Sequence, residues 1–268
     1  MDVQALGGAG AAVIKMDTAS YLARIGCAQP HAPDVEALHT LQLAHLQTVP
    51  FENLDIHAGV PIVLDDTSLT AKIVVRRRGG ICYELNGAFA WLLRALGFDV
   101  TIVAANVHAG AGAWTPDFDH MALVVTIDAQ RYLVDVGFGD SCRVPLALAQ
   151  RGRQHDGVQD YAMAEEGGWY TLSKAHLADF EVPMQPSFRF VLTPRSFDEF
   201  VPRCHFHQTS QKSHFRRKTV CSRASAGGRI TFTGTEIVIS KGLAREVTAL
   251  TNAEATDSAL SGYFGIVL

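Results

Sequence analysis

Residues 77–89, RRGGICYELNGAF, place two glycines and then a cysteine at the start of an apolar helical pattern. Unpaired N–H groups and the helix dipole favour an anion in the first turn of a helix. A cysteine thiol, whose ordinary pKa is about 8.5, can be ionised well below neutrality there, especially beside a protonated histidine. Glycines also let a backbone or a ligand approach closely. The segment therefore indicates that Cys82 is a nucleophile; the competing interpretation is a small apolar core residue.

A thiolate nucleophile needs a histidine, and the histidine needs a carboxylate that fixes its tautomer. Segments 120–127 and 130–137 alternate as strands do, and only two residues separate them, which predicts a tight hairpin. In the resulting register Asp135 lies opposite Ala122, on the same face as His120 and diagonal to it. Asp135 also stands in an apolar strand, where its charge needs a partner. The pattern predicts a His120–Asp135 pair; the alternative is two unrelated side chains at a strand edge.

The helix that begins at Cys82 is predicted from an apolar stripe at helical spacing. Its members are Cys82, Leu85, Phe89, Leu92 and Leu96. Gly97 stands where a left-handed residue commonly ends a helix. A second apolar stripe, from Leu38 to Val49, indicates an earlier helix that Pro50 ends.

After Gly97 the apolar pattern changes from helical to alternating, which predicts strands. The expected strands are residues 100–107, 120–127, 131–138, 168–173, 189–194, 228–234 and 235–240. A helix over about residues 256–263 is expected near the end of the chain. This order predicts an α+β fold: helices first, then a largely antiparallel sheet or barrel, then a small mixed part, with boundaries near residues 97 and 205.

The composition is that of an ordinary folded protein, with 48% hydrophobic and 19% charged residues among 268. The formal net charge of −4 favours neither nucleic acid nor an anionic membrane as a partner. Arg76, Arg77 and Arg78 form a short basic run, which we interpret as a solvated element end or as a contact for an anionic ligand. No apolar stretch reaches the roughly 18 residues that span a bilayer.

The cysteines indicate a reducing compartment. There are five, scattered and without a CxxC pair, and the N-terminus lacks the basic region of a signal peptide. We therefore expect a cytoplasmic protein with free thiols. The segment CHFH, residues 204–207, suggests zinc ligands, but no second ligand pair with metal spacing lies nearby, so no metal is expected.

Five motifs in the chain resemble those of the arylamine N-acetyltransferase family. They are VPFENLD (49–55), RGGICYELN (78–86), DHMALVV (119–125), LVDVGFGD (133–140) and YFGIVL (263–268). The resemblance runs from about Met16 to the end, so residues 1–15 are expected to be an extension. It implies a helical bundle over 16–97 that carries the nucleophile, a central antiparallel β-barrel over 98–205 that carries the histidine and aspartate, and an α/β lid over 206–268. The core would be cysteine-protease-like.

The resemblance also implies a reaction. Cys82, with His120 and Asp135, would take an acetyl group from acetyl-coenzyme A and pass it to the nitrogen of an arylamine, hydrazine or arylhydroxylamine, with ping-pong kinetics through an acetyl-cysteine. The Cys82 backbone N–H is a candidate donor to the developing oxyanion. The chain would act as a monomer or homodimer. The same triad would also suit a papain- or transglutaminase-like cysteine hydrolase, or an amide synthase that releases a polyketide. A binding module that keeps the fold without catalysis is the remaining alternative.

By the same motifs, Phe51, Tyr83 and Phe138 are expected to shape the acceptor pocket, or else to be ordinary core aromatics. Gly137 and Gly139 would let coenzyme A approach the backbone, although tight turns use glycines in the same way.

Overall fold

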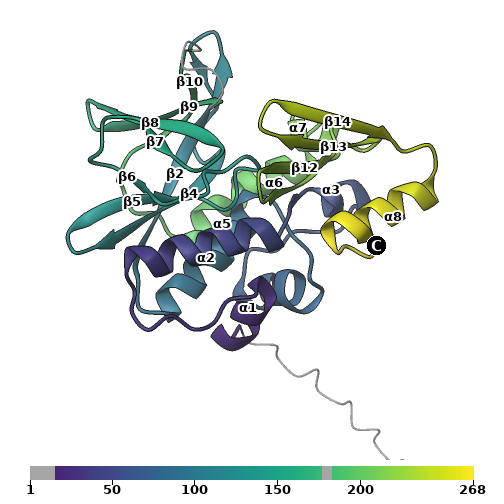
Figure 1. Ribbon diagram of the computed structural model, residues 1–268, viewed down its shortest axis with the longest axis horizontal. Coiled ribbons are helices and arrows are strands. Elements are labelled where there is room, and N and C mark those ends of the chain that lie inside the picture. Colours follow the sequence, from purple (N-terminus) through teal and green to yellow (C-terminus); the bar gives the residue numbers. More distant parts are fainter. Residues whose placement is uncertain (1–15, 177–182) are drawn as a thin grey trace, which may run out of the picture.

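The computed structural model describes residues 16–176 and 183–268. In this part of the chain, helices are followed by a large antiparallel sheet and a smaller one, which confirms the predicted α+β class. Figure 1 shows the two sheets on opposite sides of the molecule, with the N-terminal helices below the larger one. The expected extension over residues 1–15 lies outside the described residues.

The first third of the chain is helical, as predicted. Its elements are α1 (Thr18–Ile25), α2 (Val35–Thr48), α3 (Leu54–Ala58), α4 (Asp66–Leu69), the π-helical turn η1 (Thr70–Val75) and α5 (Cys82–Ala95). The Asp34 carboxylate caps the start of α2 by accepting a hydrogen bond from the Ala37 N–H at 2.8 Å. Helix α2 ends two residues before Pro50, since proline lacks the N–H that a helix needs.

Helix α5 carries Cys82 at its first position. Its apolar stripe is buried, with Leu85, Phe89 and Leu92 having no exposed surface. Gly97 adopts a φ of +91°, the left-handed conformation expected just beyond a helix end. Because α5 packs against strands of the larger sheet, its first turn lies where the helical and β parts meet.

The larger sheet is a nearly closed antiparallel barrel with the strand order β6-β5-β4-β2-β10-β9-β8-β7, and β3 pairs with β2. The strands are β2 (Asp99–Gly110), β3 (Ala113–Trp114), β4 (His120–Ile127), β5 (Gln130–Val134), β6 (Leu146–Ala147), β7 (Gln154–His155), β8 (Gln159–Glu166), β9 (Trp169–His176) and β10 (Gln185–Phe190). Strand β4 is buried on both faces. Met121 packs with the helices and Ala122 packs with the barrel interior.

The predicted hairpin register between β4 and β5 is confirmed. Ile127 pairs with Gln130, and Leu123 pairs with Val134. The two loop residues, Asp128 and Ala129, both have positive φ angles, of 48° and 63°. Positive φ at both central residues matches the turn whose twist suits a two-residue hairpin.

Two expectations about the extent of strands are wrong. The strand expected over 131–138 stops at Val134, because Asp135 turns the chain by accepting a hydrogen bond from the Gly137 N–H at 2.8 Å. The strand expected over 189–194 is β10, which ends at Phe190.

The remaining elements form a five-stranded sheet with helices around it. They are η2 (Phe197–Phe200), α6 (Val201–Thr209), α7 (His214–Arg217), β11 (Cys221–Ser225), β12 (Gly228–Phe232), β13 (Glu236–Lys241), β14 (Ala244–Ala249) and α8 (Ala253–Phe264). Strand β1 (Phe51–Glu52) pairs with β11, so the N-terminal segment contributes an edge to this sheet. The domain boundaries near residues 97 and 205 stay a prediction. Among the described residues, no helix is both long enough and apolar enough to span a bilayer.

Candidate active site

Cys82 opens α5 and is only 3% exposed. The packing around this helix start requires the two glycines that precede it. A Cβ on Gly79 would lie 1.8 Å from the Pro50 carbonyl oxygen, and one on Gly80 would lie 2.6 Å from the Glu84 carboxylate. Both glycines therefore make room for neighbouring protein groups, which accounts for the motif without a ligand.

A buried network of charges anchors the same helix start. Glu84 accepts a hydrogen bond from the Ile81 N–H at 2.9 Å, and Lys72 Nζ lies 2.8 Å from carboxylate oxygens of both Glu84 and Asp55. Burial raises the pKa of Glu84, and the Lys72 ammonium opposes that rise. Arg78 pairs with Asp55 at 3.0 Å. The interpretation of the basic run as a solvated element end is therefore wrong for Arg78, whose side chain is 12% exposed and pairs with acids; contact with an anionic ligand stays a prediction.

His120 and Asp135 make the predicted contact. His120 Nε2 lies 2.9 Å from Asp135 Oδ2, and both side chains are almost fully buried. The other carboxylate oxygen, Oδ1, accepts hydrogen bonds from the Gly137 N–H at 2.8 Å and from Asn86 Nδ2 at 2.9 Å. These bonds hold one oxygen of the carboxylate and leave the other for the imidazole.

Asn86 links the elements that carry these residues, and its part in the site escaped prediction. Its Nδ2 donates to the Met121 carbonyl at 2.6 Å and to Asp135, while its Oδ1 accepts from the Val136 N–H at 2.9 Å. It lies one helical turn after Cys82, on the same face. A buried amide on an apolar helix must form hydrogen bonds. The position of Asn86 on this helix was therefore the signal from which its role could have been predicted.

Backbone positions bring the segment of Cys82 close to the segments of the imidazole and the carboxylate. The N–H of Met121, the residue after His120, lowers the pKa of the Cys82 thiol. A Cβ on Gly137, two residues after Asp135, would lie 2.8 Å from the Cys82 Cα. Three segments that are distant in the sequence thus converge at the start of α5.

Burial is the strongest influence on the Cys82 thiol. It raises the pKa of the thiol well above the usual value, the Met121 N–H lowers it, and the carboxylates of Asp135 and Asp119 raise it further. The expectation that the helix start makes this thiol acidic is therefore wrong, because desolvation raises its pKa well above the usual value. A thiolate here needs a positive charge on the imidazole that Asp135 holds.

The three aromatic residues expected in the acceptor pocket divide into two groups. Phe51 and Phe138 line a cavity, and the Phe138 ring packs edge-on against His120 with 5.0 Å between the ring centroids. Tyr83 is fully buried elsewhere. Its ring lies 5.8 Å from that of Phe200, so the structure does not bring it to the cavity.

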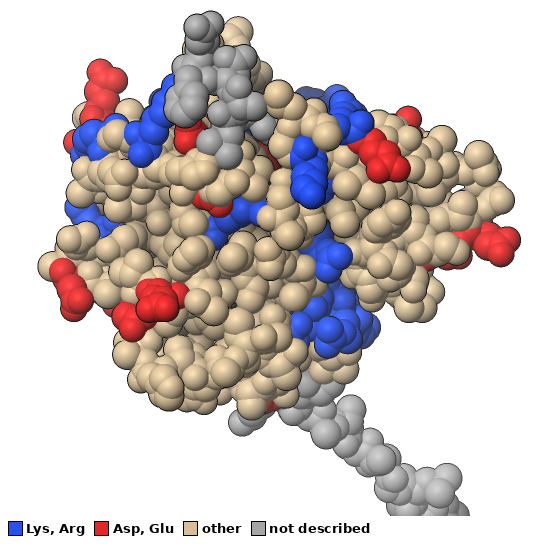
Figure 2. All heavy atoms as spheres, viewed as in Figure 1, with Lys and Arg blue, Asp and Glu red and all other residues tan. Residues whose placement is uncertain are grey.

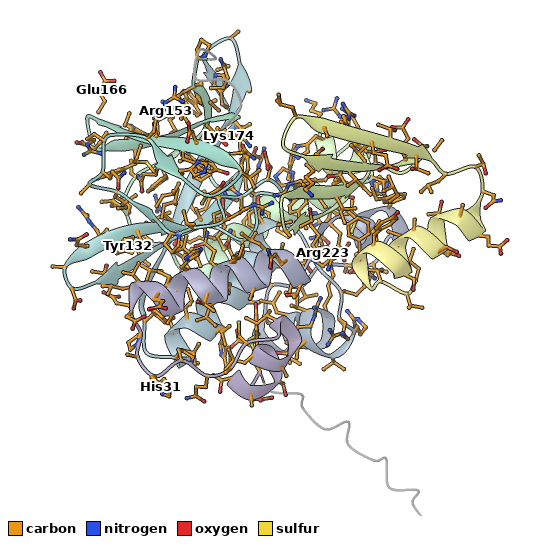
Figure 3. The ribbon with its side chains drawn as sticks, viewed as in Figure 1. His31, Tyr132, Arg153, Glu166, Lys174 and Arg223 are labelled. Carbon is orange, nitrogen blue, oxygen red and sulfur yellow. The ribbon has the colours of Figure 1, made fainter. Side chains whose placement is uncertain are left out.

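The cavity has a volume of about 930 Å³ and lies between the barrel and the C-terminal sheet. Its described lining includes four basic residues and one acidic residue, namely Arg143, Lys174, Arg229, Arg245 and Asp140. Figure 2 shows basic side chains gathered along the boundary between the two sheets. Figure 3 labels Lys174, which reaches this boundary from β9. The cavity is therefore apolar at its Phe51 and Phe138 end and mixed elsewhere, with basic side chains of which Lys174 and Arg229 pair with Asp140.

The two glycines expected to contact coenzyme A lie in different places. Gly139, with a φ of +85°, lines the cavity, and its carbonyl accepts a hydrogen bond from Arg229. Gly137 packs against Asn86 and the Cys82 backbone. Contact with coenzyme A stays a prediction for both.

The described residues contain no group of three or more His, Cys, Asp or Glu side chains arranged to hold a metal ion. In the CHFH segment, His207 lies 3.1 Å from the Asp119 carboxylate. This histidine is thus occupied by a protein partner.

Comparison with known proteins assigns the chain to a class and then to a family. A sequence model described as N-acetyltransferase matches residues 34–268. The pineal gland isozyme of arylamine N-acetyltransferase from Gallus gallus is 35% identical over 231 residues, which cover 80% of this chain and 79% of that relative. The chain is therefore an N-acetyltransferase by sequence.

Solved structures agree with this class. The arylamine N-acetyltransferase of Salmonella typhimurium superimposes with a TM-score of 0.87 at 30% identity, covering 93% of this chain and 90% of that one. The Mycobacterium marinum arylamine N-acetyltransferase in complex with CoA gives a TM-score of 0.85 at 31% identity, covering 93% of each chain. The chain belongs to the arylamine N-acetyltransferase family, a family of acyltransferases.

Proposed function

We propose that this chain transfers an acetyl group from acetyl-coenzyme A to the nitrogen of arylamines, hydrazines or arylhydroxylamines. The observation that carries the proposal is the convergence of Cys82 with the hydrogen-bonded His120–Asp135 pair at the first turn of α5. Membership of the arylamine N-acetyltransferase family supports it.

In the first half of the reaction, Cys82 passes its proton to His120 and the sulfur attacks the thioester carbonyl carbon of acetyl-coenzyme A. The developing oxyanion faces the start of α5, where the Cys82 N–H has no partner within the helix. The carbon–sulfur bond to coenzyme A then breaks, and His120 returns the proton to the departing thiolate. The products are acetyl-Cys82 and free coenzyme A.

In the second half, the neutral amine attacks the carbonyl carbon of acetyl-Cys82. His120 accepts a proton from the nitrogen, and the Cys82 sulfur leaves with the electron pair of the broken bond. Arylamines suit this route because they are weakly basic, so much of the pool is uncharged and nucleophilic near pH 7. Two successive half-reactions predict ping-pong kinetics.

Asp135 and Asn86 support this chemistry without touching the acyl group. The carboxylate of Asp135 accepts from His120 and stabilises the imidazolium that forms in each half-reaction. Asn86 holds Asp135 and the start of β4 at fixed positions relative to Cys82.

The cavity suits both substrates. Coenzyme A carries phosphate groups, and the basic residues of the lining complement their charge. Phe51 and Phe138 supply the apolar end, and Phe138 stands beside His120, so we assign them to the aromatic ring of the acceptor. Of Gly137 and Gly139, only Gly139 lines the cavity, and we assign it to the cosubstrate.

We further propose a cytoplasmic location and a monomeric or homodimeric state. All five cysteines have free thiols, which supports a reducing compartment. Sedimentation at micromolar concentration tests the oligomeric state.

Mass spectrometry after incubation with acetyl-coenzyme A alone tests the function. One acetyl group is expected on Cys82, and adding an arylamine should remove it with formation of the amide. The Cys82→Ala variant should remain unmodified, whereas Cys27→Ala should load as the parent does. Cys27 is the matched control because it is the least buried of the five thiols.

The outcome also separates the alternatives. An acetyl group that appears on Cys27 instead, or amide formation by Cys82→Ala, would refute covalent catalysis at Cys82. Loading that simple arylamines fail to discharge would favour a larger acceptor, as in an amide synthase. Absence of any adduct would favour the hydrolase or the binding module.

A further inference from the structure

A second buried acid lies directly before His120. Asp119 is 7% exposed, and its Oδ1 accepts hydrogen bonds from Arg203 Nε at 2.7 Å and from Arg203 Nη2. His207 Nε2 lies 3.1 Å from the same oxygen, and His207 is 1% exposed. Arg203 and His207 both come from α6, so this helix contacts the residue that precedes the proposed catalytic histidine.

The backbone is strained at Phe118, the residue before Asp119. Phe118 has a φ of +63°, in the left-handed region that bulky residues rarely adopt. Its carbonyl accepts a hydrogen bond from the Tyr83 hydroxyl at 2.9 Å, which ties the turn to the residue after Cys82. Its ring packs edge-on against Phe200 with 5.1 Å between centroids. Strain of this kind persists only when the surroundings fix it, and it concentrates at functional sites.

Asp119 also acts electrostatically on Cys82, the proposed nucleophile. The Asp119 carboxylate is one of the charges that raise the pKa of the Cys82 thiol. Burial alone would raise the pKa of Asp119 itself, but His207 and Arg203 lower it well below its usual range. Asp119 is therefore ionised near the sulfur, and its partners determine how much of its charge Cys82 experiences.

We propose that Arg203 and His207 are positioning residues that act through Asp119. They hold the Phe118 turn that precedes His120, and the Arg203 guanidinium balances the charge of a buried carboxylate that would otherwise oppose formation of the thiolate. This inference rests on the proposed role of Cys82 as nucleophile.

Other ionisable groups also face Cys82 or Asp119 and can affect the pH dependence of alkylation. Those that face Cys82 or Asp119 are Tyr83 from α5, His120 from β4, Asp135 from the turn after β5, Cys204 from α6 and His214 from α7. None of them donates to the Asp119 carboxylate in the described part of the chain, so Arg203 and His207 are the groups to change.

The test follows alkylation of Cys82 by iodoacetamide against pH, with mass spectrometry as readout, so it needs neither substrate. The paired variant Arg203→Met/His207→Gln should raise the apparent pKa of alkylation by about half a unit, which slows the reaction at pH 7 about threefold. Adding Asp119→Asn should return the profile to that of the parent, because the uncompensated charge is gone. Arg151→Met, which removes a surface cation 3.7 Å from Glu165, is the control and should leave the profile unchanged.

Each outcome either supports or overturns the proposed role of Arg203 and His207. An unchanged profile in the folded paired variant, or a shift that Asp119→Asn does not reverse, overturns the proposal, since a purely structural defect would not be rescued by removing a charge. If the paired variant does not fold, Arg203→Met is compared with Arg203→Met/Asp119→Asn, and equal profiles overturn it. Failure of the parent to load acetyl from acetyl-coenzyme A would instead refute the proposed function and leave the alkylation result standing.

Discussion

Replacing Asn86 with alanine tests whether one amide holds the proposed catalytic residues together. The side chain has no exposed surface and makes three hydrogen bonds, to Met121, Asp135 and Val136. Alanine leaves the Met121 carbonyl and the Val136 N–H without these partners and removes one donor from Asp135. A buried polar group that loses its partner costs about 1–3 kcal/mol. Two such groups and a weakened carboxylate together give a loss of about 3 kcal/mol.

Two measurements follow from that figure. A loss of about 3 kcal/mol should lower Tm by roughly 6–12 °C for a domain of this size. At 25 °C, where the Asn86→Ala protein is still folded, acetyl loading of Cys82 should slow roughly tenfold to a hundredfold, because displacement of catalytic groups by about 1 Å has effects of that order. Calorimetry gives the first quantity, and rapid-quench mass spectrometry gives the second.

Gln154→Ala is the matched control. Gln154 is also a buried amide, and it bonds the Ala147 N–H at 2.8 Å, the Ala147 carbonyl at 3.0 Å and the Gln150 carbonyl at 3.4 Å. It lies in β7, at the end of the barrel sheet. It should lose comparable stability and load Cys82 at the parent rate. If Asn86→Ala behaves in the same way, with loading intact, Asn86 does not position the site and the reasoning is refuted.

Three further changes test other parts of the structure. Asp135→Asn keeps the shape but removes the charge that supports the imidazolium, so the rate of acetyl transfer at pH 7 should fall by about a hundredfold or more; near-parent kinetics would contradict this. Gly79→Ala would place a Cβ 1.8 Å from the Pro50 carbonyl oxygen, so urea unfolding should show a loss above about 3 kcal/mol, and parent-like stability would argue against the close approach. Burial raises the pKa of Asp140, but the Lys174 ion pair and its neighbours lower it to about 2, so its contribution to stability is complete above about pH 4 and is lost as the pH falls toward 2. Asp140→Asn should therefore be less stable at pH 7 by an amount that shrinks below pH 4, and a difference independent of pH would contradict the assignment.

Local patterns were sufficient for the elements that carry the site. The spacing of apolar residues located α5 from Cys82, because a buried helix needs a continuous stripe. The two-residue loop at Asp128 and Ala129 fixed the register of β4 and β5, since a shift by one residue would turn every side chain to the other face. The contact between His120 and Asp135 follows from that register.

Contacts between distant segments could not be predicted from the sequence. Arg78 reads as part of an exposed basic run, but its side chain is only 12% exposed and pairs with acids that precede it by more than twenty residues. Tyr83 follows Cys82 directly in the sequence, but its hydroxyl bonds the Phe118 carbonyl before β4, and the residue does not line the cavity. Such roles depend on which faces meet after folding, and periodicity contains no information on that point.

The pairing of charges around Cys82 explains how one imidazole can serve both half-reactions. Two carboxylates raise the pKa of the buried thiol, and each faces a basic side chain: Asp135 faces His120 and Asp119 faces Arg203. While His120 is protonated, both pairs are neutral and the free N–H groups at the start of α5 favour the thiolate. In the proposed mechanism, formation of acetyl-Cys82 removes the negative charge of the thiolate, and Asp135 is the anion that still faces the imidazolium. His120 would then give its proton to departing coenzyme A and be left neutral, which is the state that can accept a proton from the amine.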